Sequence, residues 1–394
     1  MAQKKPAGKS PINTEERFPM VATTLQGLEE VLADELRKIG GNEIVLGKRA
    51  VTFTADKDLV YKANLRLRTA LRILKPLNKF RASNEDEFYK KVKAIDWPSF
   101  FDVDKTFLIR STVTGEVFTN SHYITLKCKD AVVDHFNEKL GSRPSIDSRF
   151  PDVVIHLKIN RNDVNISLDS SGTPLNKRGY RQAEAAAPVN ECLAAGMLLL
   201  SGYQGKTTLV DGMCGSGTLC IEAALMANQI APGLLRDEFS FMHWKDYDAD
   251  LYEIIHQATV NRIKDAPVRI IGFEKKFAVV QQARDAAQIA GVEEMVEFRM
   301  TSFFEEQPPA PPAHLVMNPP YGERLKERDI EQFYTRIGDK LKADYAGYQA
   351  WILSANNDAM KRIGLRTFNT FHLMNGKLPV RFSGYRMYTG SKNQ

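Results

Sequence analysis

Residues 314–325, HLVMNPPYGERL, carry side chains that could bind a flat ring bearing an amine. An apolar, strand-like run ends there in Asn318, Pro319, Pro320 and Tyr321. The two prolines remove two backbone donors and fix two φ angles, and a residue before a proline is kept out of the helical region. The Asn318 amide can donate and accept hydrogen bonds, and the Tyr321 ring offers a large flat face. The stretch therefore predicts a stiff turn that could hold an amine-bearing ring.

A glycine-rich turn in residues 209–224, LVDGMCGSGTLCIEAA, is a second candidate for ligand binding. Asp211 ends a strand-like run, and three glycines follow before a helix: Gly212, Gly215 and Gly217. A phosphate-binding P-loop needs a lysine after its last glycine, and none follows Gly217. The dinucleotide fingerprint GxGxxG fits weakly, because Cys220 stands at its third glycine. A loop for S-adenosyl-L-methionine fits best, with Asp211 facing the positive end of that cofactor; a plain strand-to-helix turn is the alternative.

The next strand-like run, VRIIGFE, ends in Glu274. An acid at this strand end can accept hydrogen bonds from the ribose hydroxyls of a bound adenosine. The alternative is a carboxylate that interacts with the dipole of the following helix. The order along the chain, Asp211 before Glu274, favours the cofactor interpretation.

The elements that must position these residues differ between the two halves of the chain. From about Leu175, strand-like and helical runs alternate, which predicts a mostly parallel sheet with helices on both faces and ligands beyond the carboxyl ends of its strands. A helix in this half is expected to open at Pro188. The first half predicts shorter α+β elements: a strand and a helix in 21–41, a hairpin in 42–56, a helix over 56–74, strands in 106–115 and 153–171, and a helix over 124–141.

Composition is that of a globular chain without a membrane anchor. Of 394 residues, enough for two or three domains, 43% are hydrophobic and 26% are charged. No apolar run approaches the roughly 20 residues that span a bilayer, and the basic N-terminus lacks the apolar core of a secretory signal. The four cysteines form no CxxC and the seven histidines no HExxH, so neither a metal site nor a disulfide framework is expected. A reducing cytoplasm is the expected location.

The formal net charge is +6, and basic residues gather between Tyr61 and Arg81. That segment contains seven basic residues and no acid: Lys62, Arg66, Arg68, Arg72, Lys75, Lys79 and Arg81. Such a run fits a surface that binds nucleic-acid phosphates, and it fits equally a solvated helix face.

In this order, VDGMCGSGTLCIEAA and VMNPPYGERL resemble the class I methyltransferases that modify exocyclic amines of nucleobases. Residues 119–136, TNSHYITLKCKDAVVDHF, are similar to the core of a THUMP domain, an RNA-binding module, and residues 175–203 to the segment that joins THUMP to its methyltransferase. The chain is identified as a member of the THUMP-domain RNA methyltransferases. It resembles the amino-terminal half of the bacterial 23S ribosomal RNA guanine-N2 methyltransferases of the RlmL type. Longer members carry a second methyltransferase domain, so the resemblance implies only the first activity.

The resemblance implies a region-by-region organisation: a disordered basic tail (1–18), a ferredoxin-like part (19–58), a THUMP RNA-binding domain (59–171), and a Rossmann-like methyltransferase domain with a mostly parallel seven-stranded sheet (172–394). The implied cofactor is S-adenosyl-L-methionine. The implied partner is RNA, with ribosomal RNA favoured over transfer RNA. The implied cofactor-binding residues are Asp211, Gly212, Cys214, Gly215, Gly217, Thr218, Glu274, Ser302, Phe303, Pro188 and Glu191. We expect RNA contacts from Lys127, Lys129, Arg66, Arg68, Arg72, Arg178 and Arg181.

The same resemblance gives the NPPY turn a catalytic role, carried by Asn318, Pro319, Pro320 and Tyr321. The Asn318 oxygen and the Pro319 carbonyl would accept the two N–H groups of the target amine, and Tyr321 would stack on the base. Ser302 stands where relatives usually place an aspartate near the adenine amine, so a neutral contact is expected there, with Phe303 stacking alongside. The alternatives are a transfer RNA guanine-N2 methyltransferase, an N6-adenine methyltransferase of RNA or DNA, and an RNA-binding protein without catalysis.

Overall fold

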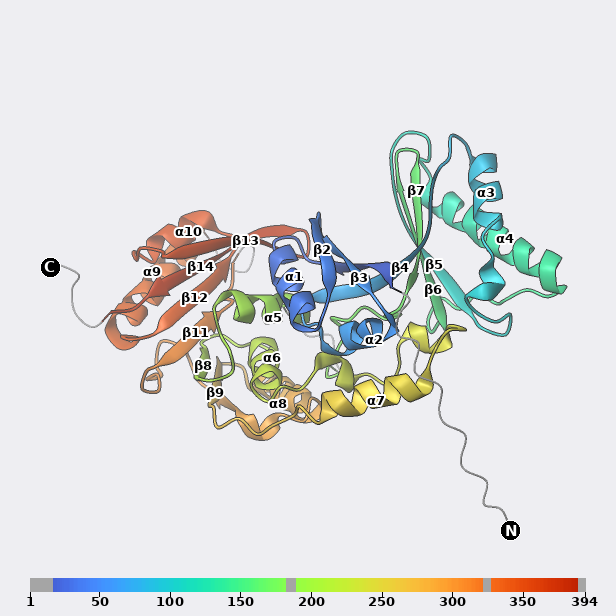
Figure 1. The fold of residues 1–394 in the computed structure, drawn as a ribbon. Helices are drawn as coiled ribbons and strands as arrows, with labels where there is room; N and C mark the ends of the chain where they lie inside the picture. Colours follow the sequence, from blue (N-terminus) through green and yellow to red (C-terminus); the bar gives the residue numbers. More distant parts are fainter. Residues whose placement is uncertain (1–16, 182–188, 322–326, 389–394) are drawn as a thin grey trace, which may run out of the picture.

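The computed structural model describes residues 17–181, 189–321 and 327–388, which form two seven-stranded sheets (Figure 1). Of the expected tail 1–18, residues 1–16 lie outside the described residues, and Phe18 already belongs to strand β1. Within the described ranges, no helix combines the length and the apolar character needed to cross a membrane.

The N-terminal half builds one continuous sheet in the order β2-β3-β1-β4-β7-β6-β5. Its strands are β1 (Phe18–Thr24), β2 (Asn42–Gly47), β3 (Ala50–Ala55), β4 (Ala70–Arg81), β5 (Phe107–Thr114), β6 (Val153–Asn160) and β7 (Asp163–Asp169). Its helices are α1 (Glu29–Lys38), α2 (Lys57–Arg66), α3 (Glu85–Lys93), η1 (Trp97–Ser99) and α4 (Ser121–Leu140). The long strand β4 pairs antiparallel with β1 on one side and with β7 on the other. The two parts that the resemblance distinguishes in this half therefore share one sheet.

The helix expected over 56–74 is wrong beyond Arg66. Helix α2 ends at that residue, and β4 begins at Ala70. The Glu35 carboxylate, on α1, accepts hydrogen bonds from the backbone N–H groups of Arg68 at 2.8 Å and Thr69 at 3.0 Å, and this contact holds the chain in a turn. Most of the basic run then lies on a strand, where successive side chains point to opposite faces. The other elements expected in this half are confirmed.

The C-terminal half builds the mostly parallel sheet that the sequence predicts, in the order β10-β9-β8-β11-β12-β14-β13. The first five strands in this order are parallel, and β14 and β13 add an antiparallel edge. The strands are β8 (Thr208–Asp211), β9 (Ile270–Glu274), β10 (Val296–Met300), β11 (Ala313–Met317), β12 (Gln349–Ser354), β13 (Asn369–Asn375) and β14 (Leu378–Arg386). The helices are α5 (Glu191–Leu200), α6 (Thr218–Ala227), α7 (Ala249–Val260), α8 (Phe277–Ile289), η4 (Glu293–Met295), α9 (Glu327–Asp344) and α10 (Asn357–Arg362). Apolar clusters cover both faces.

Helix α5 begins at Glu191 rather than at Pro188, where the sequence suggested it would open. The Asn190 side-chain oxygen accepts hydrogen bonds from the backbone N–H groups of Cys192 at 2.9 Å and Leu193 at 3.4 Å. Asn190 is therefore the N-cap, a position that favours asparagine because the first amides of a helix have no partner within it. Pro188 lies outside the described residues.

The segment between α6 and β9 joins the two halves. It contains η2 (Pro232–Leu235), η3 (Ser240–His243) and α7, which lies along α2 (Figure 1). The ring of Tyr61 on α2 lies 4.6 Å from that of Phe241, and the Tyr61 hydroxyl accepts a hydrogen bond from the Asp248 backbone N–H at 3.0 Å. The Arg236 guanidinium donates to carbonyls of the chain that leaves β7: Ser171, Thr173, Pro174 and Lys177. These contacts fix the N-terminal sheet against the C-terminal half.

Candidate active site

The predicted site residues follow neighbouring strands of the C-terminal sheet. Strands β10, β9, β8 and β11 lie side by side and run parallel. Since the carboxyl ends of parallel strands meet at one edge, this arrangement places four residues along that edge in the order Ser302, Glu274, Asp211 and Asn318. The chain order reverses between β8 and β11, which is where ligands bind in open α/β sheets.

The three glycines after β8 have different structural roles. A Cβ on Gly212 would lie 2.5 Å from an atom of the Phe303 ring, and a Cβ on Gly217 would lie 2.7 Å from the Phe298 ring. Both glycines are therefore required by packing beneath the turn. A Cβ on Gly215 would meet no atom within 4 Å beyond its chain neighbours, and the φ of this residue, 53°, lies in the left-handed region. Gly215 is the position at which a ligand could approach the backbone closely.

Two acids lie at the ends of β8 and β9. Asp211 is 1% exposed and accepts a hydrogen bond from the Met213 backbone N–H at 3.1 Å. Burial, with a contribution from the Glu274 charge, raises the pKa of Asp211 to about 7. Glu274 is half-buried and accepts a hydrogen bond from the Lys276 backbone N–H at 3.0 Å. A positively charged ligand would favour ionisation of Asp211, because an opposite charge stabilises a buried carboxylate.

Among the described residues, side chains of the types that bind metal ions do not gather at this edge. Across the ranges that the structure describes, no three His, Cys, Asp or Glu side chains are grouped as a metal ion would require. The cysteines of the turn, Cys214 and Cys220, are buried free thiols.

Arg181 lies at the glycine turn and not on the surface that we expected to contact RNA. Its guanidinium donates to Thr218 Oγ1 at 2.6 Å and to the Val189 carbonyl at 2.7 Å, and it pairs with the Glu191 carboxylate at 3.2 Å. Arg181 thus joins the first turn of α5 to the first turn of α6. Its position does not fit the RNA contact that we expected. Thr218 and Glu191 lie beside the glycine turn, and their contact with the cofactor stays a prediction.

Ser302 and Phe303 follow β10. Ser302 is 4% exposed, and its hydroxyl accepts a hydrogen bond from the Phe304 backbone N–H at 3.2 Å. The Phe303 ring is 2% exposed, with its centroid 5.4 Å from those of Phe304 and Tyr345. The ring supports the turn from within the core, so its position does not fit the expected stacking beside an adenine.

Asn318 presents an acceptor without a partner. Its Oδ1 is buried and makes no hydrogen bond with any residue that the structure describes. Leaving a buried acceptor unpaired costs about 1–3 kcal/mol, so a ligand that brings a donor would be bound favourably there. Pro319, the residue after it, is buried.

The Tyr321 ring is half-buried against the apolar cluster on one face of the sheet. Its hydroxyl accepts a hydrogen bond from Asn375 Nδ2 at 2.8 Å. Asn375 is the last residue of β13, and the sequence did not point to it, because it lies 54 positions from Tyr321 and no local pattern links the two. The Asn375 amide fixes one end of the ring that was predicted to stack on a base.

Arg178, also assigned to RNA from the sequence, is a core residue. It is 1% exposed, pairs with the Glu222 carboxylate at 3.3 Å and donates to the Arg68 carbonyl at 2.5 Å. Tyr180 donates to the same Glu222 oxygen at 3.2 Å. A phosphate of bound RNA cannot reach such a guanidinium, so the role of Arg178 is to tie the N-terminal sheet to α6.

Two further arginines are held by protein partners. Arg68 donates to the carbonyls of Leu225 at 3.2 Å and Ile230 at 2.7 Å, at the C-terminal end of α6. Arg72, with 12% of its side chain exposed, pairs with the buried Asp169. Arg68 Nη2 and Arg72 Nη1 bind carbonyls and a carboxylate inside the protein, which does not fit the contact of these atoms with RNA that we expected.

Lys127 and Lys129 lie on α4, at the surface of the THUMP part. Their ammonium groups lie 3.4 Å from Asp86 and 2.7 Å from Asp130, with 23% and 34% of the side chains exposed. Exposed pairs of this kind contribute about 0–1 kcal/mol, so a phosphate could replace the carboxylates.

A mostly parallel sheet with a glycine turn after β8 and an amide acceptor after the neighbouring, central strand β11 defines a class I methyltransferase. A second, largely antiparallel sheet precedes it in the chain. Residues 178–383 match the family described as UPF0020, RMKL-like, methyltransferase domain. Residues 82–169 match the THUMP domain, and residues 19–74 match the RlmL ferredoxin-like domain. The chain belongs to the RMKL-like methyltransferase family, which confirms the resemblance seen in the sequence.

Relatives match this chain over nearly its whole length. A Synechocystis sp. protein, provisionally named RNA methyltransferase slr0064, is 36% identical over 94% of this chain and 97% of its own length. The crystal structure of SMU.472, provisionally named a methyltransferase and complexed with SAH, has a TM-score of 0.88 at 28% identity and covers 96% of this chain and 100% of that one. A Listeria monocytogenes protein, described as a predicted N6-adenine-specific DNA methylase, has a TM-score of 0.84 at 27% identity and covers 94% of this chain and 97% of that one.

Proposed function

We propose that this chain is an S-adenosyl-L-methionine-dependent RNA methyltransferase that transfers a methyl group to guanine N2 of 23S ribosomal RNA. The observation that carries transfer to an amine is the buried Oδ1 of Asn318, which has no partner among the described residues. It follows the strand next to the Asp211 turn, where a cofactor and a base would meet. An exocyclic amine fits this acceptor, because it carries two N–H donors and no charge.

S-adenosyl-L-methionine supplies an electrophilic methyl group on a sulfonium. The residues present suit it: Gly215 leaves open space beside the backbone, and Asp211 offers a carboxylate whose ionisation a positive ligand would favour. Glu274 ends the next strand, and in the proposed complex its carboxylate accepts hydrogen bonds from the ribose hydroxyls. The SAH in the similar structure of SMU.472 supports the same cofactor here.

The protein has to make a weak nucleophile reactive, because the lone pair of an exocyclic amine is delocalised into its ring. Asn318 Oδ1 accepts one N–H and the Pro319 carbonyl accepts the other, which turns the lone pair toward the methyl group and disperses the positive charge that develops on nitrogen. Tyr321 stacks on the extruded base, an interaction worth roughly 1–3 kcal/mol, and Asn375 holds its hydroxyl. The methylated ammonium is acidic enough to lose its proton to water. Alignment of the reactants supplies most of the acceleration.

RNA as the substrate is supported by the THUMP domain at residues 82–169 and by the name of the Synechocystis relative. The choice of guanine N2 and of ribosomal RNA rests on the likeness to RlmL, whose ferredoxin-like domain matches residues 19–74. Methylation of adenine N6 is the second candidate, because the Asn318 acceptor suits that amine equally and the Listeria relative is described as a predicted N6-adenine-specific DNA methylase.

The proposal is tested by nucleoside mass spectrometry of RNA from cells that lack the protein, with 23S, 16S and transfer RNA separated before digestion. We expect N2-methylguanosine to decrease in 23S RNA and to return when the wild-type chain, but not Asn318→Ala, is supplied. A loss of N6-methyladenosine instead would establish the second candidate. Unchanged nucleosides in all three fractions would contradict both.

A further inference from the structure

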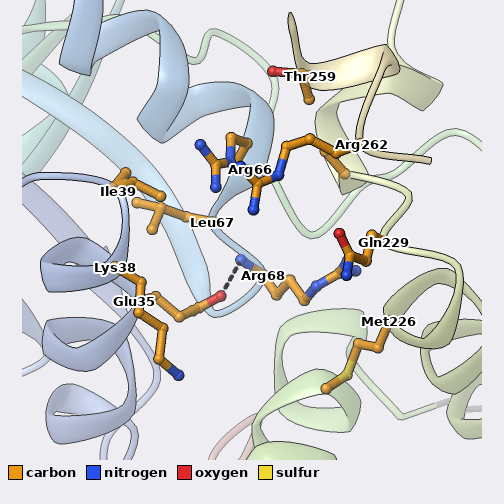
Figure 2. Close-up of a pocket in the computed structure, with 11 residues that line it drawn as sticks. Glu35, Lys38, Ile39, Arg66, Leu67, Arg68, Met226, Gln229, Thr259 and Arg262 are labelled. Atoms are coloured by element: carbon orange, nitrogen blue, oxygen red, sulfur yellow. Dashed lines mark hydrogen bonds between the residues drawn. The ribbon is translucent and has the colours of Figure 1, made fainter. Parts of the chain in front are cut away.

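A pocket of about 190 Å³ lies at the junction of the two halves, away from the methyl-transfer site (Figure 2). It is lined by α1, α2, the end of α6 and the segment after α7, through residues that include Glu35, Arg66, Arg68, Gln229 and Arg262. Helix α6 begins at the glycine turn and ends at this pocket, and its ten residues span about 15 Å. The pocket therefore lies toward the opposite edge of the sheet from Asn318.

The lining is strongly basic. Four cations, Lys38, Arg66, Arg68 and Arg262, meet one carboxylate, that of Glu35. This carboxylate is already occupied, since it accepts hydrogen bonds from the backbone N–H groups of Arg68 and Thr69. Figure 2 shows the side chains of Arg66 and Arg262 extending toward each other, whereas the Lys38 ammonium points away.

The two facing guanidinium groups lack a counter-ion. Within the described part of the chain neither Arg66 nor Arg262 forms an ion pair. Asp58 is the acid whose charge acts on Arg66, and it is paired with Lys62 at 2.5 Å. Burial and the neighbouring Arg262 charge both lower the pKa of Arg66. Arg68 keeps a buried Nη1 without a hydrogen-bond partner among the described residues. Like charges brought together at a half-buried position raise the free energy of the site unless an anion joins them.

We propose that this pocket binds a compact phosphate-class anion between Arg66 and Arg262, apart from the site of methyl transfer. Guanidinium groups form paired hydrogen bonds with phosphate oxygens, which gives geometry as well as charge complementarity. The volume is below the roughly 300–1,000 Å³ of pockets for drug-sized ligands, so the site accommodates a phosphate or diphosphate group and not a whole nucleotide. That group belongs either to a small phosphorylated molecule or to the RNA backbone.

The test is calorimetric titration of the full chain with inorganic pyrophosphate at constant ionic strength. The double variant Arg66→Gln/Arg262→Gln is compared with Arg37→Gln/Arg366→Gln, which removes the same charge from exposed positions outside the pocket. We expect the pocket variant to bind pyrophosphate at least about tenfold more weakly than wild type, as removal of one charged hydrogen bond would produce, and the control to match wild type. Equal SAH affinity in all three proteins shows that both variants are folded.

A salt titration of single-stranded RNA binding shows whether the phosphate in the pocket comes from RNA or from a small molecule. If an RNA phosphate occupies the pocket, the log–log slope of RNA affinity against salt concentration is smaller for the pocket variant than for the control. The difference is about 0.7 for each phosphate that the variant no longer binds. This outcome is expected whether or not pyrophosphate binds. If the occupant is a small molecule, the pyrophosphate affinity falls and the RNA slopes of variant and control agree. Two results together would overturn the proposal. The first is that the pocket variant binds pyrophosphate as well as the control does, or that wild type does not bind it at all. The second is that the RNA salt slopes of the variant and the control are equal.

Discussion

At the scale of single residues, the candidate site consists of side chains at three neighbouring strand ends. Asp211 and Glu274 are acids at the ends of β8 and β9, where the proposed cofactor would lie, and Asn318, after β11, would offer an uncharged acceptor to the base. Binding of cofactor and activation of the amine should therefore respond to different substitutions.

We predict that Asn318→Ala lowers kcat by roughly 10²-fold or more, the decrease typical of removing one preorganised hydrogen-bonding group, with the Kd for S-adenosyl-L-methionine close to that of wild type. The reason is that the Asn318 oxygen follows β11, on the base side of the edge. Single-turnover methyl transfer and calorimetry measure the two quantities. An equal loss of cofactor affinity would place Asn318 on the cofactor instead.

Glu274→Ala should behave in the opposite way. It removes an acceptor for ribose hydroxyls and no reacting group, so we predict a raised Kd for S-adenosyl-L-methionine and a nearly normal single-turnover rate at saturating cofactor. Glu297→Ala, an exposed acid on β10 that pairs with Arg299, is the matched control. An unchanged cofactor Kd in Glu274→Ala would count against the ribose assignment.

The pKa of Asp211, raised to about 7 by burial and by the Glu274 charge, makes the stability of the cofactor-free protein depend on pH. An unfolded aspartate titrates near ~3.9, so between about pH 4 and 7 the unfolded chain releases a proton that the folded protein keeps. Stability therefore decreases as pH rises through this window. We predict that, without cofactor, the Tm of Asp211→Asn decreases less than the Tm of wild type between about pH 5 and 8. Asp34→Asn, on the exposed face of α1, should follow wild type; a matching decline in Asp211→Asn would refute the assignment.

At the scale of elements, the sequence predicted the strands that carry the site better than the contacts that hold them together. Apolar runs ending in Asp211, Glu274 and Asn318 were sufficient to place these residues at one sheet edge. The helix expected over 56–74 failed because Glu35, on another element, binds the backbone N–H groups of Arg68 and Thr69. A partner so distant in sequence leaves no mark on the local pattern.

The arginines were misassigned for the same reason, which is that their partners lie on other elements of the fold. From sequence alone, Arg72, Arg178 and Arg181 could not be distinguished from surface residues that bind RNA, since the acids that pair with them come from other elements. Gly212 and Gly217 likewise resemble ligand-facing glycines, although aromatic rings brought in by β10 and the turn after it are what require them.

For the pair that links the N-terminal sheet to α6, we predict that Arg178→Ala lowers the free energy of unfolding by about 3–5 kcal/mol, because Glu222 is left as a buried charge without its partner. Urea unfolding measures this decrease, and Arg178→Ala/Glu222→Gln should recover part of it. The salt dependence of RNA binding should not change. A flatter salt slope at wild-type stability would restore Arg178 to the RNA-binding residues.

At the scale of the whole molecule, the THUMP surface and the methyl-transfer edge belong to different sheets that are joined by buried contacts. Helix α4, whose sequence contains Lys127 and Lys129, lies at the end of the N-terminal sheet that is far from the C-terminal half (Figure 1). RNA affinity and cofactor affinity should accordingly be separable.

We predict that Lys127→Ala/Lys129→Ala flattens the log–log salt dependence of RNA binding by about 0.7 for each phosphate that the variant no longer binds and raises the KM for RNA. The KM for S-adenosyl-L-methionine should stay unchanged, because neither lysine approaches the glycine turn. Lys361→Ala, whose exposed ammonium pairs with Asp358 on α10, is the control for charge. Matching slopes in the double variant and wild type would mean that these lysines only solvate the surface.

The glycines at the junction of the halves bear on how freely such a protein could exchange its parts during evolution. A Cβ on Gly196 would lie 2.6 Å from the Leu28 side chain, and one on Gly233 would lie 2.5 Å from the Leu65 backbone. A graft of the RNA-binding half from a relative would leave both glycines in place and would bring its own residue to the position of Leu28. The atoms that approach Gly233 are backbone, so the residue type at position 65 does not affect that contact, whereas a side chain larger than leucine at position 28 would collide with the α5 backbone at Gly196. We therefore expect functional chimaeras when the grafted half carries a residue no larger than leucine at position 28.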